Sequence, residues 1–310
     1  MSIVERQHYV WRKYLTAWCV GNTVWCSRFK EGALFASNPI NLAVERYFYG
    51  LTDLTTEDVQ FVRAFVVDRV NNAELRKLNT GWIAHYEVLF ALVRELRDSN
   101  ADNTNLLEQI ATLLTQIEEQ ALGDVERSAN EHLDSLIGGD VSFYDDPDQA
   151  SKFLIFLTQQ YFRTKKIRDA VVERMTVGVP TSGMGRAWPI MRQIFATNVG
   201  ACIFAKRATM KLCLLEAPDE MEFITCDQPV INTYAVFNPS DTTEEDEFYY
   251  PVSPTRAIIL SEHASYHGLH GTKLSVLRAQ YLNDLIAKAA YEQRFARRRA
   301  SLEAYVSKAP

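Results

Sequence analysis

Three short segments of the chain combine proton-exchanging or anion-binding side chains with an apolar, aromatic frame. They read QHYVWR at residues 7–12, QQYFRT at residues 159–164 and FITCDQP at residues 223–229. Burying such polar groups without partners costs roughly 1–3 kcal/mol each. We therefore expect the three segments to meet in the fold, although they lie far apart in the sequence.

Asp227 and His8 are the candidate acid–base residues. Asp227 lies where a predicted strand gives way to a turn before Pro229, and there its carboxylate is placed to act as a general base or a metal ligand. The alternative is an Asx-turn, in which the carboxylate accepts nearby backbone N–H groups. His8 titrates near neutral pH and is a candidate proton donor, and the alternative is a structural hydrogen bond.

Arg12, Gln160 and Arg163 are the candidate anion-binding residues. Gln160 and Arg163 are three residues apart, so they share one side of a predicted helix. Arg163 begins a basic stretch that runs to Arg168, which suits the negative end of a helix dipole. The alternative is that Arg163 grips a phosphate or carboxylate with two parallel hydrogen bonds.

Three histidines, His263, His267 and His270, have a spacing that would align them on one face of a helix. However, Gly268 and Gly271 favour a loop, and the segment lacks the glutamate that known helical two-histidine sites carry between their ligands. We therefore expect a solvated loop here rather than a metal site.

Four arginines are predicted to end the last helix, where their charge suits the helix dipole. The alternative is a local nucleic-acid track, because phosphate binding needs only local positive charge. The four are Arg294, Arg297, Arg298 and Arg299.

Composition limits the class of protein. The chain has 310 residues, of which 47% are hydrophobic and 23% charged, with a formal net charge of −6. These values are typical of a globular protein and disfavour whole-surface attraction to DNA or anionic membranes. The five cysteines are scattered, which predicts reduced thiols and a cytoplasmic location. No signal-peptide pattern, membrane-length apolar run, P-loop, dinucleotide-binding motif or nucleophile elbow is present.

Hydrophobic periodicity predicts an α+β protein with one domain over residues 1–310. A mainly antiparallel sheet is expected from about 20–50 and 205–262, with a helical insertion at about 55–204. Within it, the helices are predicted to start near residue 55 and to cover 73–97, 103–137, 147 to about 175, and 188–202. The last segment, 272 to about 304, is predicted to be one helix.

The three opening segments resemble, in this order, those of a bacterial family known as domain of unknown function 4238. Its members carry His-Tyr-Val-Pro-Arg, then Gln-x-x-Arg-Thr, then Ser-Asp-Asn-Pro and an asparagine in a final helix, for which Asn283 is the candidate. This chain departs at Trp11, Cys226 and Gln228. The resemblance covers nearly the whole chain and groups the candidate residues, but it implies no reaction.

The leading hypothesis is an enzyme acting on a phosphate-containing substrate, such as a nuclease-like effector. The anion would be held by Arg12, Gln160, Arg163 and Asn283. Asp227 would act as base or metal ligand and His8 as proton donor, with a divalent metal as candidate cofactor and a nucleotide or nucleic acid as candidate partner. The alternative is a non-catalytic ligand- or partner-binding module, in which the polar set is a buried structural network and the acidic loop 241–247 is the first partner surface to test.

Overall fold

The computed structural model describes residues 4–175, 182–237 and 246–306, and these form an α+β fold, as predicted. The acidic loop 241–247 lies mostly outside the described residues. Within these ranges, the larger sheet has five strands and is antiparallel except for its β10–β5 edge pair. In spatial order the strands are β10 (Thr272–Lys273), β5 (Lys211–Glu216), β9 (Arg256–Ser261), β8 (Phe248–Pro251) and β7 (Ile231–Asn232).

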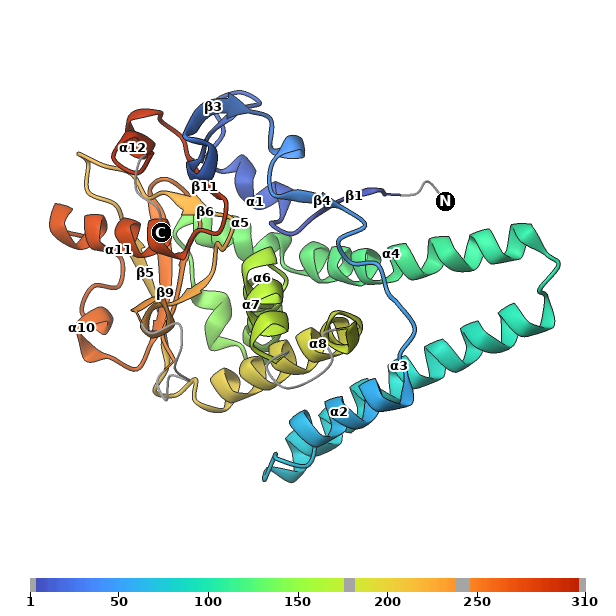
Figure 1. The fold of residues 1–310 in the computed structure, drawn as a ribbon. Coiled ribbons are helices and arrows are strands. Elements are labelled where there is room, and N and C mark those ends of the chain that lie inside the picture. The colour runs from blue at the N-terminus through green and yellow to red at the C-terminus, as the bar shows by residue number, and fades with distance from the viewer. Residues whose placement is uncertain (1–3, 176–181, 238–245, 307–310) are drawn as a thin grey trace.

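The larger sheet is buried on both faces because both sides of its strands are apolar. Leu212 and Leu214 of β5 pack with helices α5 (Asn130–Gly138) and α6 (Pro147–Phe162), whereas Cys213 packs on the opposite side. That opposite side is covered by helix α11 (Val276–Ala289), which supplies a row of alanine, leucine and isoleucine side chains. The sheet is therefore the middle layer between two helical layers (Figure 1).

A second sheet of four strands corrects two predictions. Its order is β3 (Ala33–Ser37), β2 (Val24–Arg28), β11 (Gln293–Ala296) and β6 (Thr225–Cys226). The N-terminal strands therefore pair with a strand from the end of the chain and do not join the larger sheet. The predicted helix over 272–304 is wrong beyond Ala289, where α11 ends and β11 follows before the short helix α12 (Ala300–Glu303). Pairing with β2 and β6 outweighs the helix propensity of these residues.

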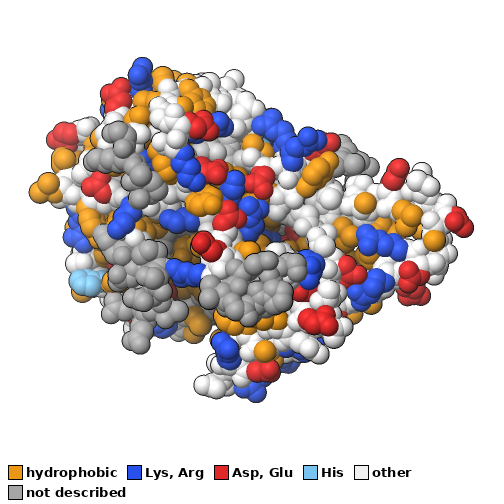
Figure 2. All heavy atoms as spheres, in the orientation of Figure 1, with side chains coloured by type: hydrophobic (Ala, Val, Ile, Leu, Met, Phe, Trp, Pro, Cys, Tyr) orange, Lys and Arg blue, Asp and Glu red, His pale blue; other side chains and the backbone are white. Residues whose placement is uncertain are grey.

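The four arginines consequently do not end a helix. Arg294 lies in β11, where its side chain is buried and donates to the carbonyl oxygens of Ala287 and Tyr305. Arg298 lies beside Glu222, and Arg299 beside Glu303. On the face shown in Figure 2, basic and acidic side chains are interspersed over the described atoms.

The helices between the two sets of strands make a separate core. Helices α3 (Ala73–Ser99) and α4 (Thr104–Ser128) run antiparallel as an arm that projects from the sheets (Figure 1). Apolar side chains of these two helices pack with α2 (Thr56–Val66) and α8 (Ser182–Ala205). A capping box, in which Thr55 and Asp58 bond each other's backbone N–H, starts α2.

Two predicted helices are each divided in two. The expected helix over 103–137 breaks at Ala129, between α4 and α5. The expected helix from 147 to about 175 breaks after Phe162, where α6 ends, and α7 (Lys165–Met175) follows. Among the helices of the described ranges, none is long and apolar enough to cross a membrane.

The chain start forms a small unit beside α4. Strand β1 (Arg6–His8) pairs antiparallel with β4 (Val44–Arg46), and helix α1 (Arg12–Thr16) follows β1. The remaining short elements are the 3-10 turns η1 (Phe29–Glu31), η2 (Pro39–Asn41) and η3 (Ser142–Asp145) and the helices α9 (Thr233–Phe237) and α10 (Ala264–His267).

Candidate functional site

Arg163 follows the last turn of α6, and its side chain is only 2% exposed. Its Nε donates to the Tyr49 hydroxyl at 2.8 Å and its Nη2 to the carbonyl oxygen of His8 at 2.7 Å. Its Nη1 forms an ion pair with Glu126 of α4. Arg163 therefore ties the segment of residues 7–12 to α4 and α6, and these donors are already used within the fold.

Asp227 follows strand β6 and is 1% exposed. Its Oδ1 accepts the N–H of Tyr291 at 2.8 Å, and its Oδ2 accepts those of Glu292 and Gln293 at 2.7 and 3.0 Å. Burial raises the pKa of Asp227 to about 6, against the lowering effect of these three N–H groups. The carboxylate thus holds the chain between α11 and β11 in place. This is a structural role, but it is not the predicted Asx-turn, because the N–H groups that Asp227 accepts lie 64–66 residues along the chain.

Other predicted residues have similar structural tasks. The Thr164 hydroxyl bonds the side chain of Gln228, which links α6 to the turn after β6. Asn283 of α11 accepts the N–H of Ile224 at 3.0 Å and donates to the carbonyl oxygen of Glu222 at 2.9 Å. Gln160 is buried within α6, and its Nε2 has no hydrogen-bond partner among the described residues.

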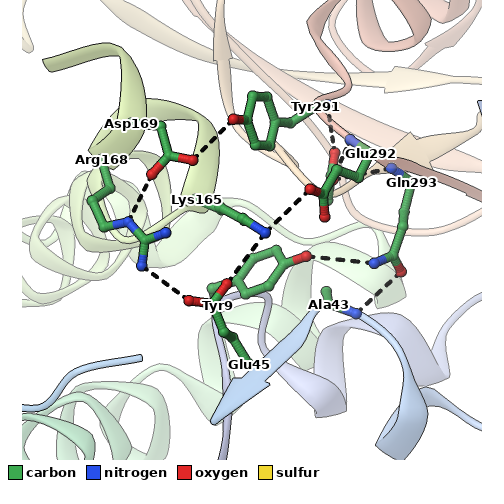
Figure 3. A network of polar contacts seen from close by, with 10 residues as sticks. Tyr9, Ala43, Glu45, Lys165, Arg168, Asp169, Tyr291, Glu292 and Gln293 are labelled. Carbon is green, nitrogen blue, oxygen red and sulfur yellow. Dashed lines mark hydrogen bonds and ion pairs between the residues drawn. The ribbon is translucent and has the colours of Figure 1, made fainter. Parts of the chain in front are cut away.

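A polar network joins β4, α7 and the segment before β11 (Figure 3). The Lys165 ammonium lies between Glu45 and Glu292, at 3.2 and 3.1 Å from their oxygens. Arg168 contacts Asp169, which accepts the Tyr291 hydroxyl at 2.9 Å. Lys165 and Arg168 of the basic stretch after Arg163 are therefore paired with carboxylates, whereas the Lys166 ammonium donates to the carbonyl oxygen of Ala289.

The three opening segments do meet, through the contacts of Arg163 and of the Thr164–Gln228 pair, but the candidate catalytic residues do not share one cavity. His8, Arg12 and Arg163 line a cavity of about 780 Å³ between β1, α1 and α4. Its wall does not include Gln160, Asp227 or Asn283.

His8 brings an unused imidazole nitrogen to this cavity. Its Nε2 is buried and, within the described ranges, has no hydrogen-bond partner. Burial lowers the pKa of His8 below its usual value, the charges of Arg12 and Arg163 add to the effect, and the backbone of Ile40 and Pro39 opposes it. The neutral imidazole is therefore favoured near neutral pH, as general base catalysis requires.

Glu119 of α4 is a second proton-exchanging residue on the same wall. Its Oε2 is also buried and unpartnered among the described residues. Burial raises the pKa of Glu119, the nearby Glu126 carboxylate raises it further, and the charge of Arg163 opposes them.

The sequence prediction missed Glu119 because carboxylates on amphipathic helices are usually solvated. The neighbouring residue, however, carries a sequence signal of a buried carboxylate. Glu118 lies four residues from both Leu114 and Leu122, on the apolar face of α4. Its side chain is buried and pairs with Arg192.

Arg12 places a positive charge at the cavity wall, whereas the guanidinium group of Arg163 is bonded within the fold. The Arg12 side chain is exposed at the cavity wall, and the structure of the described residues gives it no ion-pair partner. A guanidinium group in this state can bind a phosphate or carboxylate at two points. The cavity wall therefore combines the exposed guanidinium of Arg12 with two proton-exchanging groups, His8 and Glu119, whose pKa values are shifted in opposite directions.

The histidines near α10 are separately engaged. The Nδ1 of His263 accepts the N–H of Ser265, and the Nε2 of His267 donates to the carbonyl oxygen of Ser261. His270 Nδ1 accepts the N–H of Leu214. In the described part of the chain, no three His, Cys, Asp or Glu residues are grouped to hold a metal ion.

The comparisons with known proteins give a family but no reaction. Neither the curated proteins nor the solved structures contain a match to this chain. The family model described as "Protein of unknown function (DUF4238)" matches residues 6–188 and 190–300. These residues include β1 and the elements that carry Arg163 and Asp227. Because the match covers nearly the whole chain and confirms the resemblance seen in the motifs, the protein belongs to the DUF4238 family.

Proposed function

We propose that the chain binds a small phosphate-bearing molecule in the cavity between β1, α1 and α4, and that His8 and Glu119 exchange protons with it. The observation that carries this proposal is the pair of buried, unpartnered atoms, His8 Nε2 and Glu119 Oε2, on one cavity wall. Polar atoms are rarely left unsatisfied in this way unless a ligand or water completes their bonding.

The roles follow from charge and protonation. Arg12 holds the anionic group, because its guanidinium is at the wall and is not engaged by a carboxylate of the described residues. The neutral His8 accepts a proton, and Glu119, whose pKa is raised, donates one. The volume of about 780 Å³ falls within the range of small-molecule sites and suits a mononucleotide-sized ligand.

The competing proposal is a non-catalytic binding module with a buried structural network. It is favoured by Arg163 and Asp227, whose groups are bonded within the fold. The two proposals share the cavity and differ in whether His8 and Glu119 carry out chemistry there. The nuclease hypothesis is a special case of the first proposal, with a polynucleotide as substrate.

The test measures binding and turnover separately. Calorimetric titration with inorganic phosphate and adenosine monophosphate should show binding that Arg12→Ala weakens roughly ten-fold. The matched control is Arg94→Ala, which removes an exposed arginine paired with Asp53 and should leave binding unchanged. If neither ligand binds, or both variants bind like the wild type, the anion site is wrong.

Turnover is then assayed with an aryl phosphate, labelled RNA and labelled DNA, each with and without Mg²⁺. Cleavage that is lost in His8→Asn and Glu119→Gln, but kept in Glu108→Gln on the exposed side of α4, supports the acid–base roles. Ligand binding without turnover of any substrate would instead support the binding module.

A further inference from the structure

A second cavity lies where the end of α8 meets the start of β5. It has a volume of about 760 Å³, and its wall is formed by η3, by His267 and His270, and by part of the segment 204–213 that includes Phe204, Arg207 and Lys211 but not Lys206. No residue lines both this cavity and the one that contains His8. The proposed function does not use this cavity.

Tyr144 of η3 leaves an unsatisfied hydroxyl at this cavity. The residue is 8% exposed, and its hydroxyl oxygen is buried without a hydrogen-bond partner in the described part of the chain. Buried tyrosine hydroxyls usually find a partner. Burial raises the pKa of Tyr144 to about 12, so the hydroxyl keeps its proton at neutral pH and remains a hydrogen-bond donor.

Two cations share the wall with this donor. Arg207 lies with its guanidinium 4.8 Å from the centre of the Phe204 ring, and its positive charge acts on the Tyr144 phenol. Lys211 begins β5 and is exposed. Among the described residues, neither Arg207 nor Lys211 has an ion-pair partner, so both charges are available to a ligand.

His270 adds a hydrogen-bond donor, and the contact of its Nδ1 shows which ring nitrogen carries the proton. Its Nδ1 accepts the backbone N–H of Leu214 at 3.2 Å. In the neutral ring the proton must therefore be on Nε2, which is a donor. The wall then carries a hydroxyl, an imidazole N–H and two cations, against one exposed carboxylate, that of Asp145.

We propose that this cavity is a second anion site, which binds the oxyanion group of a small organic molecule through Arg207, Lys211, Tyr144 and His270. The shared chemistry is a phosphate, sulfate or carboxylate group that accepts several hydrogen bonds. A cavity of this size also holds the organic body to which the oxyanion is attached, and Phe204 gives that body an apolar surface.

The experiment uses the full chain carrying Arg12→Ala, which weakens the first site and leaves the second intact. Inorganic phosphate, phenyl phosphate and benzoate are titrated separately by calorimetry. Binding of phenyl phosphate and phosphate but not benzoate would identify the oxyanion as phosphate-like, whereas binding of benzoate alone would identify it as a carboxylate. We expect Arg207→Ala to weaken binding of the preferred probe by roughly ten- to a hundred-fold, and Tyr144→Phe by roughly ten-fold.

The matched control is Lys206→Ala, since Lys206 is a neighbouring exposed cation that lies outside the cavity wall and near Glu262. The chain with Lys206→Ala added should bind the preferred probe as tightly as the Arg12→Ala chain alone. Circular dichroism of each variant confirms that it is folded. The proposal is overturned if no probe binds, or if Arg207→Ala and Tyr144→Phe bind as tightly as the background while remaining folded. Because Arg12→Ala weakens the first site equally in every variant, differences between the variants report on the second site, and failure here leaves the proposed function untouched.

Discussion

Two polar regions of this protein lie close together and are built differently. Around Arg163 and Asp227, charged groups bond backbone and side chains from segments that are distant in sequence. A short distance away, at the cavity wall, His8 and Glu119 each keep a buried atom that no described residue bonds. His8 belongs to both regions, because its carbonyl oxygen serves Arg163 while its imidazole faces the cavity.

The difference suggests how to separate structural from functional polar residues in this chain. A satisfied buried charge stabilises one arrangement of the segments it joins, and its loss leaves the partner charge uncompensated. An unsatisfied buried atom costs stability in the free protein, and at a cavity wall it leaves a hydrogen bond for a ligand to complete. Substitutions should therefore affect stability in the first region and binding in the second.

The largest effect is expected from Arg163→Ala. It leaves Glu126 and the His8 carbonyl oxygen without their partner in a buried site, so the free energy of unfolding should fall by about 3–5 kcal/mol. Urea unfolding followed by circular dichroism measures this. Arg94→Ala, which breaks the more exposed pair with Asp53, should cost less than about 1 kcal/mol. Equal effects of the two substitutions would contradict the comparison.

A smaller but clear loss is expected from Asp227→Asn. In asparagine an NH2 group replaces one carboxylate oxygen and cannot accept a hydrogen bond. At least one backbone N–H of Tyr291, Glu292 or Gln293 therefore loses its partner. At pH 7.5 the free energy of unfolding should fall by about 2–3 kcal/mol. An unchanged melting temperature together with lost ligand binding or turnover would instead place Asp227 in the site, as the sequence first suggested.

Glu119→Gln should change stability little and, unlike the two substitutions above, should not lower it. The neutral amide avoids the cost of a buried carboxylate beside Glu126, so the free energy of unfolding should stay within about 1 kcal/mol of the wild type or rise. Proton exchange with the ligand should be lost. A strong destabilisation would show that Glu119 has a structural partner and belongs to the first region.

The smallest effect concerns the pH dependence of His8. Because its folded-state pKa is lowered, the unfolded chain takes up this proton first as the pH falls below about 6.5. His8 therefore costs the wild type stability on acidification. As the pH is lowered from 7.5 to 5.5, the melting temperature of His8→Asn should rise relative to that of the wild type. The rise should be equivalent to less than about 1 kcal/mol. A constant difference across this range would rule out a lowered pKa.

Some of the fold could be predicted because local pattern and structure agree. Helices α2 and α6 start near residues 55 and 147, as predicted, and their starts carry local capping features, the Thr55–Asp58 capping box and the Asp146 N-cap before Pro147. The strand β11 could not be predicted, because its residues follow a long helix directly and become a strand only by pairing with β2 and β6. Likewise the partners of Arg163, Tyr49 and His8, lie more than a hundred residues away in the sequence, so no local pattern could identify them.

Residue types, periodicity and motif order were enough to predict the α+β class, the grouping of the three polar segments and the family. Which of the grouped residues remain available for chemistry depends on how the chain packs. Residue type does not reveal whether a donor or acceptor is already bonded within the fold. Arg163 and Asp227 are bonded in this way, while Arg12, His8 and the unpredicted Glu119 face a cavity together, because only packing fixes which buried atoms find partners.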